Sequence, residues 1–257
     1  MNDRSWPYDG NGYVTQEIKD FYENLPVPDS NLTVGYYLIR DYVQANGFGT
    51  YTPNLRYPNK VLIMGGHYKY IGLDLVNAQG NNMNEKVVIT NWLGQVRVEQ
   101  NIKVENCNNN RITGKYDADY ALGNKYFTGS VHNEFGDGTF GILVDHNYKD
   151  GDPNYPGITF SGTNWGNIEL DHIEIRDGGI QGLDLKDDNG GNFVVDSVIA
   201  HDNYIHHIKN EGFYLMNTKS VSTHGPQQHM KNSSFYGNKI AGVGGEWAQA
   251  SRTTFGS

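Results

Sequence analysis

The chain has 257 residues, of which 29 are acidic and 20 are basic, and its formal net charge is -9. This acidic balance argues against a general nucleic-acid-binding protein, which needs a basic surface. No run of about 18 apolar residues occurs, so no membrane-spanning helix is expected. The single cysteine excludes an internal disulfide framework.

The sequence is rich in glycine and asparagine, with 32 and 30 residues respectively. Both residue types favour turns and left-handed backbone positions, and both are poor in helix interiors. Aromatic residues make up 12% of the chain, which is enough to build a core together with the aliphatic residues. The composition therefore predicts many short strands joined by tight turns.

Residues 1–59 differ from the rest of the chain and are predicted to form an N-terminal cap or lead-in segment. Within them, residues 13–25 fit a short amphipathic helix that begins at Thr15 and ends before Pro26. Residues 36–43 are predicted to form a second short element.

From residue 60 onward the apolar residues alternate with polar ones in short runs bounded by Gly, Asn or Asp, which is typical of strands. The predicted strands are 60–64, 70–75, 86–90, 95–98, 102–104, 111–113, 141–144 and 157–160. Residues 115–156 are the longest irregular stretch, and we interpret them as an insertion of the kind that often carries binding.

A repeat of about 30 residues organises the second half of the chain. Residues 171–188 align without a gap with residues 201–218, so that Ile175 falls on Ile205, Gly182 on Gly212, Leu183 on Phe213 and Leu185 on Leu215. A third copy begins at residue 237 with an offset of 35, which places Asn203 on Asn238.

Equal positions that recur at this spacing predict a solenoid of parallel strands in which each coil pairs with the next. Asn203 and Asn238 are then expected to form an amide ladder. Roughly 200 residues at about 25 to 30 per coil allow about seven coils. The alternative is a β-sandwich whose internal similarity is coincidental.

The predicted fold is therefore all-β, a right-handed parallel β-helix over residues 60–257 with a short helical or irregular N-terminal cap. The last coil, which ends at Ser257, shows no polar cap or closing helix. A solenoid needs covered ends, so we expect this coil to continue into a longer chain or to be covered by a partner.

The segments 63–71, 102–114, 168–175, 201–207 and 211–214 carry a resemblance to a known family. They resemble the right-handed parallel β-helix repeat proteins of the pectate-lyase-like superfamily, especially the secreted bacterial ones. The resemblance covers about residues 60–250 and implies a secreted or cell-surface location. It implies no single activity, because this fold hosts polysaccharide lyases, glycoside hydrolases, epimerases, phage tailspikes and adhesins.

The repeat also predicts which outward side chains are neighbours, with Asp184 beside Tyr214 and Arg176 beside His206. A polysaccharide lyase needs a cation to neutralise the acidic sugar and a base to remove a proton. The candidate catalytic residues are therefore Lys186, Arg176, His206 and Tyr214. The alternative is that all four are ordinary solvated residues on the outer surface.

The candidate ligand-binding residues are Asp184, Tyr204, Glu211 and Trp165. The rings of Tyr204 and Trp165 suit stacking on sugars, or else they pack in the core or a loop. The carboxylates of Asp184 and Glu211 would serve a hydrolase.

One acidic turn and one pair of histidines carry side chains that can serve as metal ligands. Asp187 and Asp188 form an oxygen-rich turn, which predicts a Ca²⁺ site or else a solvated turn. His206 and His207 are expected to face opposite ways on a strand, so that they cannot share one metal ion.

The expected function is that of an extracellular or cell-surface β-helix protein that binds or processes polysaccharide along its outer sheet face. Such a protein would be lyase- or hydrolase-like if catalytic. The alternative is a non-catalytic adhesin, filament or secreted-cargo module of a larger assembly. The expected partners are a polysaccharide or surface glycan and other subunits at the C-terminal coil, with no nucleic acid and no membrane span.

Overall fold

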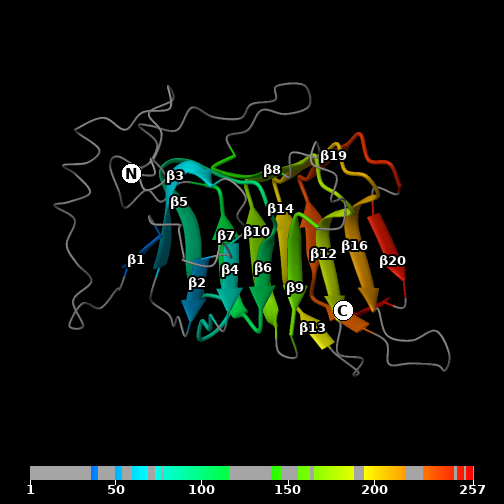
Figure 1. Ribbon diagram of the computed structural model, residues 1–257. Coiled ribbons are helices and arrows are strands. Elements are labelled where there is room, and N and C mark those ends of the chain that lie inside the picture. Colours follow the sequence, from blue (N-terminus) through cyan, green and yellow to red (C-terminus); the bar gives the residue numbers. More distant parts are fainter. Residues whose placement is uncertain are drawn as a thin grey trace, which may run out of the picture.

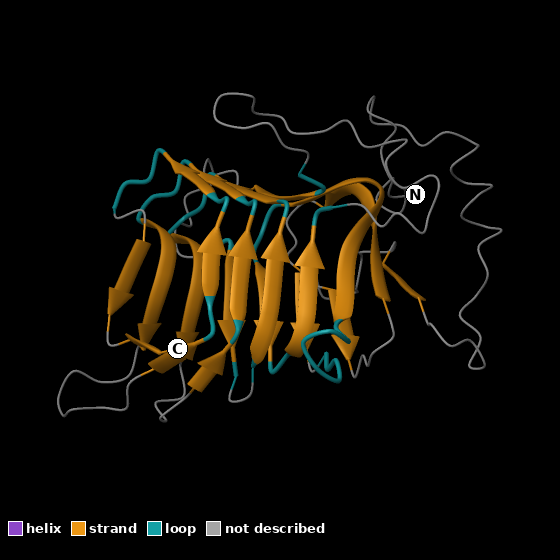
Figure 2. Cartoon of the chain, turned by 180° about the vertical axis from the view of Figure 1, so that it is seen from behind, coloured by secondary structure: helices purple, strands orange, loops and turns teal. Residues whose placement is uncertain are grey.

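The computed structural model describes residues 36–39, 50–53, 60–68, 73–76, 78–115, 140–145, 156–162, 165–187, 194–217, 228–245, 248–251 and 253–256. These residues form β-strands, turns and bends, with no helix among them (Figure 2). In this described part of the chain nothing helical is long and apolar enough to cross a membrane. The predicted helix over residues 13–25 lies outside it, as does most of the segment 1–59.

The strands form three sheets. The eleven-stranded sheet contains β1 (Tyr36–Ile39), β3 (Lys60–Tyr68), β5 (Val87–Val98), β7 (Asn108–Thr113), β8 (Ile142–Asp145), β10 (Gly166–Asp171), β11 (Ile173–Arg176), β14 (Val198–His201), β15 (Tyr204–His206), β18 (Ser234–Tyr236) and β19 (Lys239–Ala241). The seven-stranded sheet contains β2 (Thr50–Pro53), β4 (Leu73–Val76), β6 (Ile102–Glu105), β9 (Ile158–Ser161), β12 (Gln181–Asp187), β16 (Glu211–Asn217) and β20 (Ala248–Ser251). The three-stranded sheet contains β13 (Val194–Asp196), β17 (Gln228–Lys231) and β21 (Thr253–Gly256).

Every pairing between these strands is parallel. Figure 1 shows the seven-stranded sheet as arrows side by side, from β2 in blue to β20 in red. Parallel neighbours need a crossover connection, and here each crossover is one coil of the chain. The described residues therefore form an all-β parallel solenoid, as predicted.

The strand register confirms the repeat. Ile175 pairs with Ile205 between β11 and β15, and Leu185 pairs with Leu215 between β12 and β16, both at the predicted offset of 30. Ile205 then pairs with Ile240 of β19 at the offset of 35. Equal positions in successive coils thus lie above one another, as a solenoid requires.

The eleven-stranded sheet has two halves, which meet at the long strand β5. Its first part, at Val87–Thr90, pairs with β7, and its last part, at Val96–Val98, pairs with β8. We call β7–β10–β14–β18 the first half and β8–β11–β15–β19 the second half. The sequence predicted two strands where β5 is one, because the polar residues in its middle interrupt the apolar alternation.

The bends between strands account for some of the asparagines. Left-handed backbone with φ between 50 and 62° recurs at equal positions in successive coils. One series of stacked bends is Asn109, Asn167, Ser197 and Asn232, a second is His172, Asp202 and Gly237, and a third is Asp177, His207 and Gly242. Asn, Asp and Gly tolerate this conformation better than other residues, so they mark the coil corners in the sequence.

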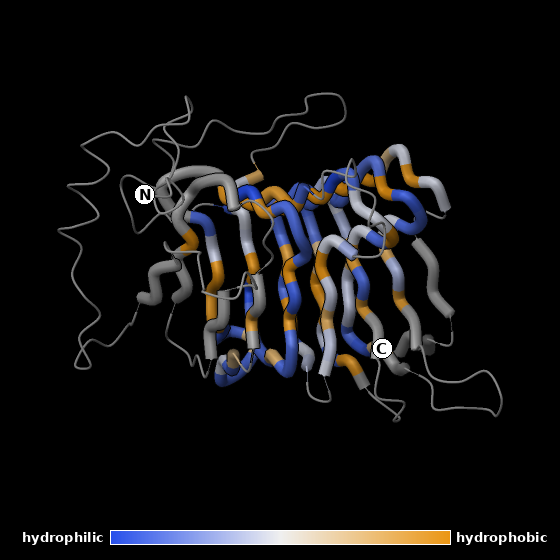
Figure 3. The backbone as a smooth tube through the Cα atoms, in the orientation of Figure 1, coloured by the Kyte–Doolittle hydropathy of each residue, from blue (hydrophilic) through white to orange (hydrophobic). Residues whose placement is uncertain are grey.

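Apolar residues alternate with polar ones along the strands (Figure 3). The apolar side chains form the buried core inside the coils. Phe160, Leu185 and Leu215 lie on three neighbouring strands of the seven-stranded sheet and are all buried. Each such side chain stabilises the fold by about 1.5–3 kcal/mol relative to exposure. The alternation with period two leaves every second residue facing outward, where the candidate site lies.

The predicted amide ladder is confirmed at the bend between the two halves. Nδ2 of Asn203 donates to Oδ1 of Asn238 over 2.9 Å, and Oδ1 of Asn203 accepts a hydrogen bond from the backbone N–H of Ile173 over 3.1 Å. Nδ2 of Asn238 donates in turn to the Ala200 carbonyl. These side chains satisfy backbone groups that have left the strand hydrogen-bonding pattern.

Gly182, which the repeat aligns with Gly212, lies where two coils approach closely. A Cβ atom at residue 182 would lie 2.5 Å from Cγ2 of Ile205 and 2.6 Å from the Gly212 carbonyl oxygen. We expect Gly182→Ala to lower the free energy of unfolding by about 1–3 kcal/mol, because backbone cannot yield as a side chain does. Urea unfolding measures the change. Gly166→Ala is the matched control, because the atom nearest to the added Cβ, the Asp196 carbonyl oxygen, lies farther away, at 3.2 Å. An equal loss of stability in both variants would contradict the explanation.

Candidate functional site

The outward face of the first half brings together charged residues from three coils. Along β10 the side chains of Ile168 and Leu170 point into the core, so Glu169 and Asp171 point outward. Arg111 of β7 pairs in register with Glu169, and His201 of β14 pairs with Asp171. We call Glu169, Asp171 and His201, with the cations that contact them, the outward charge cluster.

Asp171 lies at the centre of the outward charge cluster, and its side chain is fully buried. Its carboxylate accepts hydrogen bonds from the Thr113 hydroxyl and from Nε of Arg111, the latter over 2.8 Å. Nδ1 of His172 lies 2.7 Å from the same carboxylate. Three donors around one carboxylate replace the water that burial has removed.

Glu169 and His201 lie nearer the surface. Nζ of Lys86 contacts one carboxylate oxygen of Glu169 at 2.7 Å, and Nε2 of His201 lies 3.3 Å from the other. Nδ1 of His201 lies 2.9 Å from Asp202, which follows it at the bend. His201 thus bridges two carboxylates, and the cluster is connected from β7 to β14.

The hydrogen bonds set the ionisation of both carboxylates. Burial of Asp171 opposes ionisation, but the hydrogen bonds from His172 and Arg111 outweigh it, and the pKa of Asp171 lies well below its ordinary value. For Glu169, burial is likewise outweighed by the hydrogen bond from Lys86 and the charge of Arg111, which lower its pKa. Both groups are therefore negatively charged at neutral pH.

His201 shifts in the opposite direction. Burial opposes its charged form, but hydrogen bonds to Asp202 and Glu169 outweigh burial and raise the pKa of His201 above its ordinary value. The charged form of His201 is thus favoured more than in a free histidine.

The cluster also has the composition of a metal site, because Glu169, Asp171 and His201 each offer a ligand atom within 4.8 Å of the others. The same carboxylates already accept charge-assisted hydrogen bonds from Lys86 and Arg111. A divalent cation would have to displace these contacts. The arrangement therefore favours a charge-compensated network over a metal centre.

A second group of charged residues lies on the outward face of the second half. NH2 groups of Arg97 and Arg176 both contact Oδ2 of Asp145, at 2.6 and 2.7 Å. Nε2 of His206 lies 3.1 Å from Oε1 of Glu174. The strand register thus brings together Arg176 and His206, two of the four candidate catalytic residues, as predicted.

The alternative that the candidate catalytic residues are solvated is wrong for His206, which is buried, and Glu174 and Tyr204 on the same face are buried as well. Leu143 and Phe140, on or next to β8, are buried too, although Leu143 lies in register with the outward Glu174. The face is therefore covered within the folded chain, which alternation along a strand does not reveal. The Tyr204 ring stacks on His206 with 4.1 Å between ring centroids.

The other two candidate catalytic residues, Lys186 and Tyr214, lie on β12 and β16 of the seven-stranded sheet. They occupy neighbouring strands: Lys186 pairs with Met216, and Tyr214 pairs with Asp184 as predicted. The structure therefore divides the four candidates between two sheets, with Arg176 and His206 on one and Lys186 and Tyr214 on the other.

The candidate ligand-binding residues are less accessible than predicted. Asp184 and Tyr204 are buried, and Trp165 packs in the core against Phe160 with 5.3 Å between ring centroids. Trp165 is thus a core residue, and its ring is buried. Glu211 is half-buried at the start of β16 and accepts a hydrogen bond from Gln181 of the preceding coil over 3.2 Å.

The predicted Ca²⁺ ligands fall outside the structural description. Asp188 lies outside the described residues, and only the backbone of Asp187 is described, at the end of β12. Most of the predicted insertion 115–156 lies outside them as well.

Sequence reasoning missed Glu169, Asp171 and His201 as site residues, although the repeat contained the necessary signal. In the alignment at an offset of 30, Asp171 falls on His201, and Glu169 precedes Asp171 by two positions on the same face. An acidic pair that faces a histidine of the next coil is thus visible in the sequence once the register is known.

Comparison with known proteins adds no relative. No protein-family model, curated protein or solved structure matches the chain. The fold places the protein in the class of all-β parallel solenoids, and this class by itself implies no single function.

Proposed function

We propose that this protein binds a neutral polysaccharide on the outward face of the first half, with the ring of Tyr236 as the stacking surface. Tyr236 is 55% exposed, which is unusual for a large aromatic residue in the described part of the chain. Its ring lies parallel to that of His201, with 4.9 Å between centroids and 3° between planes. This exposed, immobilised ring is the observation that carries the proposal.

The position of Tyr236 leaves one ring face for a ligand. His201 covers the face toward β14, and β18 is the last strand of the first half among the described residues. Sugar rings combine apolar C–H faces with hydroxyl groups at their edges, so they bind where an aromatic face adjoins polar side chains.

The outward charge cluster supplies those polar groups. Arg111 is 34% and Asp202 is 51% exposed, and both are held by hydrogen bonds or ion pairs to buried or half-buried partners. Side chains fixed in this way lose little freedom when a ligand binds. The net charge of -9 repels an acidic polymer at long range, which favours a neutral glycan.

The ionisation of the cluster favours binding over hydrolysis. A glycoside hydrolase needs one carboxylic acid with a raised pKa to protonate the leaving group. Hydrogen bonds lower the pKa of both Glu169 and Asp171, so neither suits that role. We therefore propose a binding protein of the pectate-lyase-like β-helix type, secreted or exposed at the cell surface, in line with the family resemblance.

The test is a binding panel of neutral and acidic polysaccharides with the full chain and Tyr236→Ala. We expect wild-type binding to a neutral glycan and about two- to tenfold weaker binding by the variant, because ring stacking contributes roughly 0.5–1.5 kcal/mol. New reducing ends and new ultraviolet absorbance, followed in the same samples, are expected to stay at background. Lys231→Ala, on β17 of another sheet, is the control. Equal affinity of Tyr236→Ala and wild type would contradict the proposal.

A second candidate function is a structural module that assembles through its end coil. Among the described strands, β18, β19, β20 and β21 each pair on one side only. Unpaired parallel edges are templates for strand addition. Sedimentation velocity distinguishes this candidate, because it requires a mass that increases with protein concentration.

A further inference from the structure

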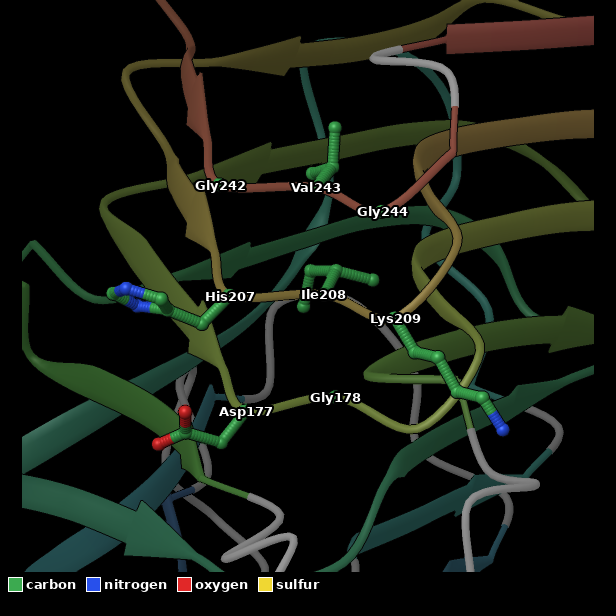
Figure 4. Close-up of a pocket in the computed structure, with 8 residues that line it drawn as sticks. All are labelled: Asp177, Gly178, His207, Ile208, Lys209, Gly242, Val243 and Gly244. Carbon is green, nitrogen blue, oxygen red and sulfur yellow. The ribbon is translucent and has the colours of Figure 1, made fainter.

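A pocket lies over the third series of stacked bends, away from the outward charge cluster. It has a volume of about 430 Å³ and is lined by Asp177, Gly178, His207, Ile208, Lys209, Gly242, Val243 and Gly244 (Figure 4). Three successive coils each contribute one turn to it, after β11, β15 and β19. The pocket therefore runs along the solenoid axis.

The pocket has two different rims. Figure 4 shows Asp177 and His207 on one side, Lys209 on the other, and Ile208 and Val243 between them. Ile208 is buried and Val243 packs against the core, so the centre of the pocket is apolar. An apolar centre between hydrogen-bonding rims matches a ring that has C–H groups on its face and hydroxyl groups at its edge.

His207 differs from the prediction that it faces away from His206. Its backbone has a φ of 52°, which ends β15 and turns the side chain back. Nδ1 of His206 and Nδ1 of His207 lie 2.7 Å apart, and the two rings meet edge to face at 71°. Two ring nitrogens at this distance share one proton, so the two imidazoles are coupled.

A buried carboxylate decides where that proton lies. Oε1 of Glu174 is 3.1 Å from Nε2 of His206, and both side chains are buried. Oε2 of Glu174 has no hydrogen-bond partner among the described residues. A buried carboxylate whose other oxygen has no partner needs the N–H of its neighbour. Nε2 of His206 therefore carries a hydrogen and donates a hydrogen bond to Oε1 of Glu174.

The tautomers of both histidines follow from this contact. In the tautomer of His206 with its proton on Nε2, Nδ1 accepts the hydrogen bond from Nδ1–H of His207. Nε2 of His207 then carries a lone pair. The exposed imidazole at the rim of the pocket is thus a fixed hydrogen-bond acceptor, and Glu174 and His206 are positioning residues behind it.

Other charged groups surround this chain of hydrogen bonds without breaking it. NH1 of Arg176 lies 3.7 Å from Oε1 of Glu174, but its NH2 is hydrogen-bonded to Asp145. The ring of Tyr204 stacks on the ring of His206 and holds it in place. Lys239 pairs in register with Tyr204 on the next strand.

We propose that this pocket is a second sugar-binding site, in which Nε2 of His207 accepts a hydrogen bond from a ligand hydroxyl. The proposal rests on the proposed function for its ligand class, but on different residues for its geometry. Asp177 offers a second acceptor on the same rim, and Lys209 offers a donor on the opposite rim.

The tautomers are tested without a ligand, by NMR of the full chain labelled with ¹⁵N in its histidines. With both imidazoles in their neutral form, we expect a proton on Nδ1 of His207 and none on its Nε2. His206→Phe retains an aromatic ring on Tyr204 but removes the acceptor, and His207 is then expected to populate both tautomers. A proton on Nε2 of His207 in the wild type, or an unchanged spectrum in His206→Phe, would overturn the proposal.

Ligand binding is tested by titrating cellohexaose, mannohexaose and oligogalacturonate into the same sample. We expect a neutral hexaose to shift the His207 resonances, and we expect about tenfold weaker binding at this site in His207→Ala, with Lys231→Ala unchanged. A shift of His207 that persists in Tyr236→Ala assigns it to the pocket. If Tyr236→Ala abolishes binding and the His207 resonances never shift, the second site is overturned and the first is supported. If none of the three sugars shifts the His207 resonances, the second site is likewise overturned.

Discussion

Replacement of Asp171 by asparagine is expected to lower the free energy of unfolding by about 3 kcal/mol. The carboxylate is fully buried and accepts hydrogen bonds from Arg111 and Thr113. An amide has one acceptor oxygen and brings its own N–H groups toward these donors, so it leaves a cation without its counter-charge. Loss of one member of a buried pair costs about 3–5 kcal/mol, and the partial exposure of Arg111 places the expected value at the lower end.

Urea unfolding with Asp202→Asn as the matched control measures this effect. Asp202 contacts His201 from an exposed position on the neighbouring bend, so its substitution is expected to cost less than about 1 kcal/mol. Asparagine also tolerates the left-handed backbone of residue 202. A similar loss in both variants would contradict the central place of Asp171 in the cluster.

Asp171→Asn is also expected to change how the free energy of unfolding declines at acidic pH. The folded state lowers the pKa of Asp171, so the unfolded state binds its proton first as the pH falls. Asp171 therefore contributes stability above about pH 4, the ordinary range of an aspartate, and this contribution is lost on further acidification. Below that pH the stability of Asp171→Asn should decline less steeply than that of the wild type, and parallel declines would contradict this assignment.

Replacement of Asn203 by alanine is expected to lower the free energy of unfolding by about 2–4 kcal/mol. The Asn203 side chain is buried, accepts from the Ile173 N–H and donates to the Leu170 carbonyl. Alanine leaves both backbone groups without these partners, and each buried unsatisfied group costs about 1–3 kcal/mol. The adjacent coil also loses the contact with Asn238.

Asn210→Ala is the control for the amide ladder. Asn210 lies in the turn after β15, and the hydrogen bonds that involve it are made by its backbone. We expect its substitution to change stability by less than about 0.5 kcal/mol in the same urea titration. If Asn203→Ala is no more destabilising than this control, the ladder does not hold successive coils together.

The register was predictable because a solenoid repeats a local pattern. Each coil is one unit of chain, so residues that pair in space are separated by a constant distance in sequence, as with Leu185 and Leu215. Asn203 and Asn238 were recognisable for the same reason. The third sheet was missed, because its strands, such as β13 at Val194–Asp196, are too short to show alternation.

The candidate site was less predictable, because exposure does not follow from alternation. Glu174 and Glu169 occupy outward positions on consecutive strands, yet Glu174 is buried and Glu169 is half-buried. The direction of His207 depended on one backbone angle, which the sequence does not reveal because histidine occurs in strands and bends alike.

The amino-acid sequence by itself determined the class of fold, the coil length and the coil-to-coil partners, because these depend on periodic placement of apolar and turn-forming residues. Only the tertiary structure decided which outward residues meet water and which charges compensate one another. That outcome depends on what covers each face and on the angle between sheets. The outward charge cluster around Asp171 and the pocket beside His207 both arise at this level, where side chains from three coils converge.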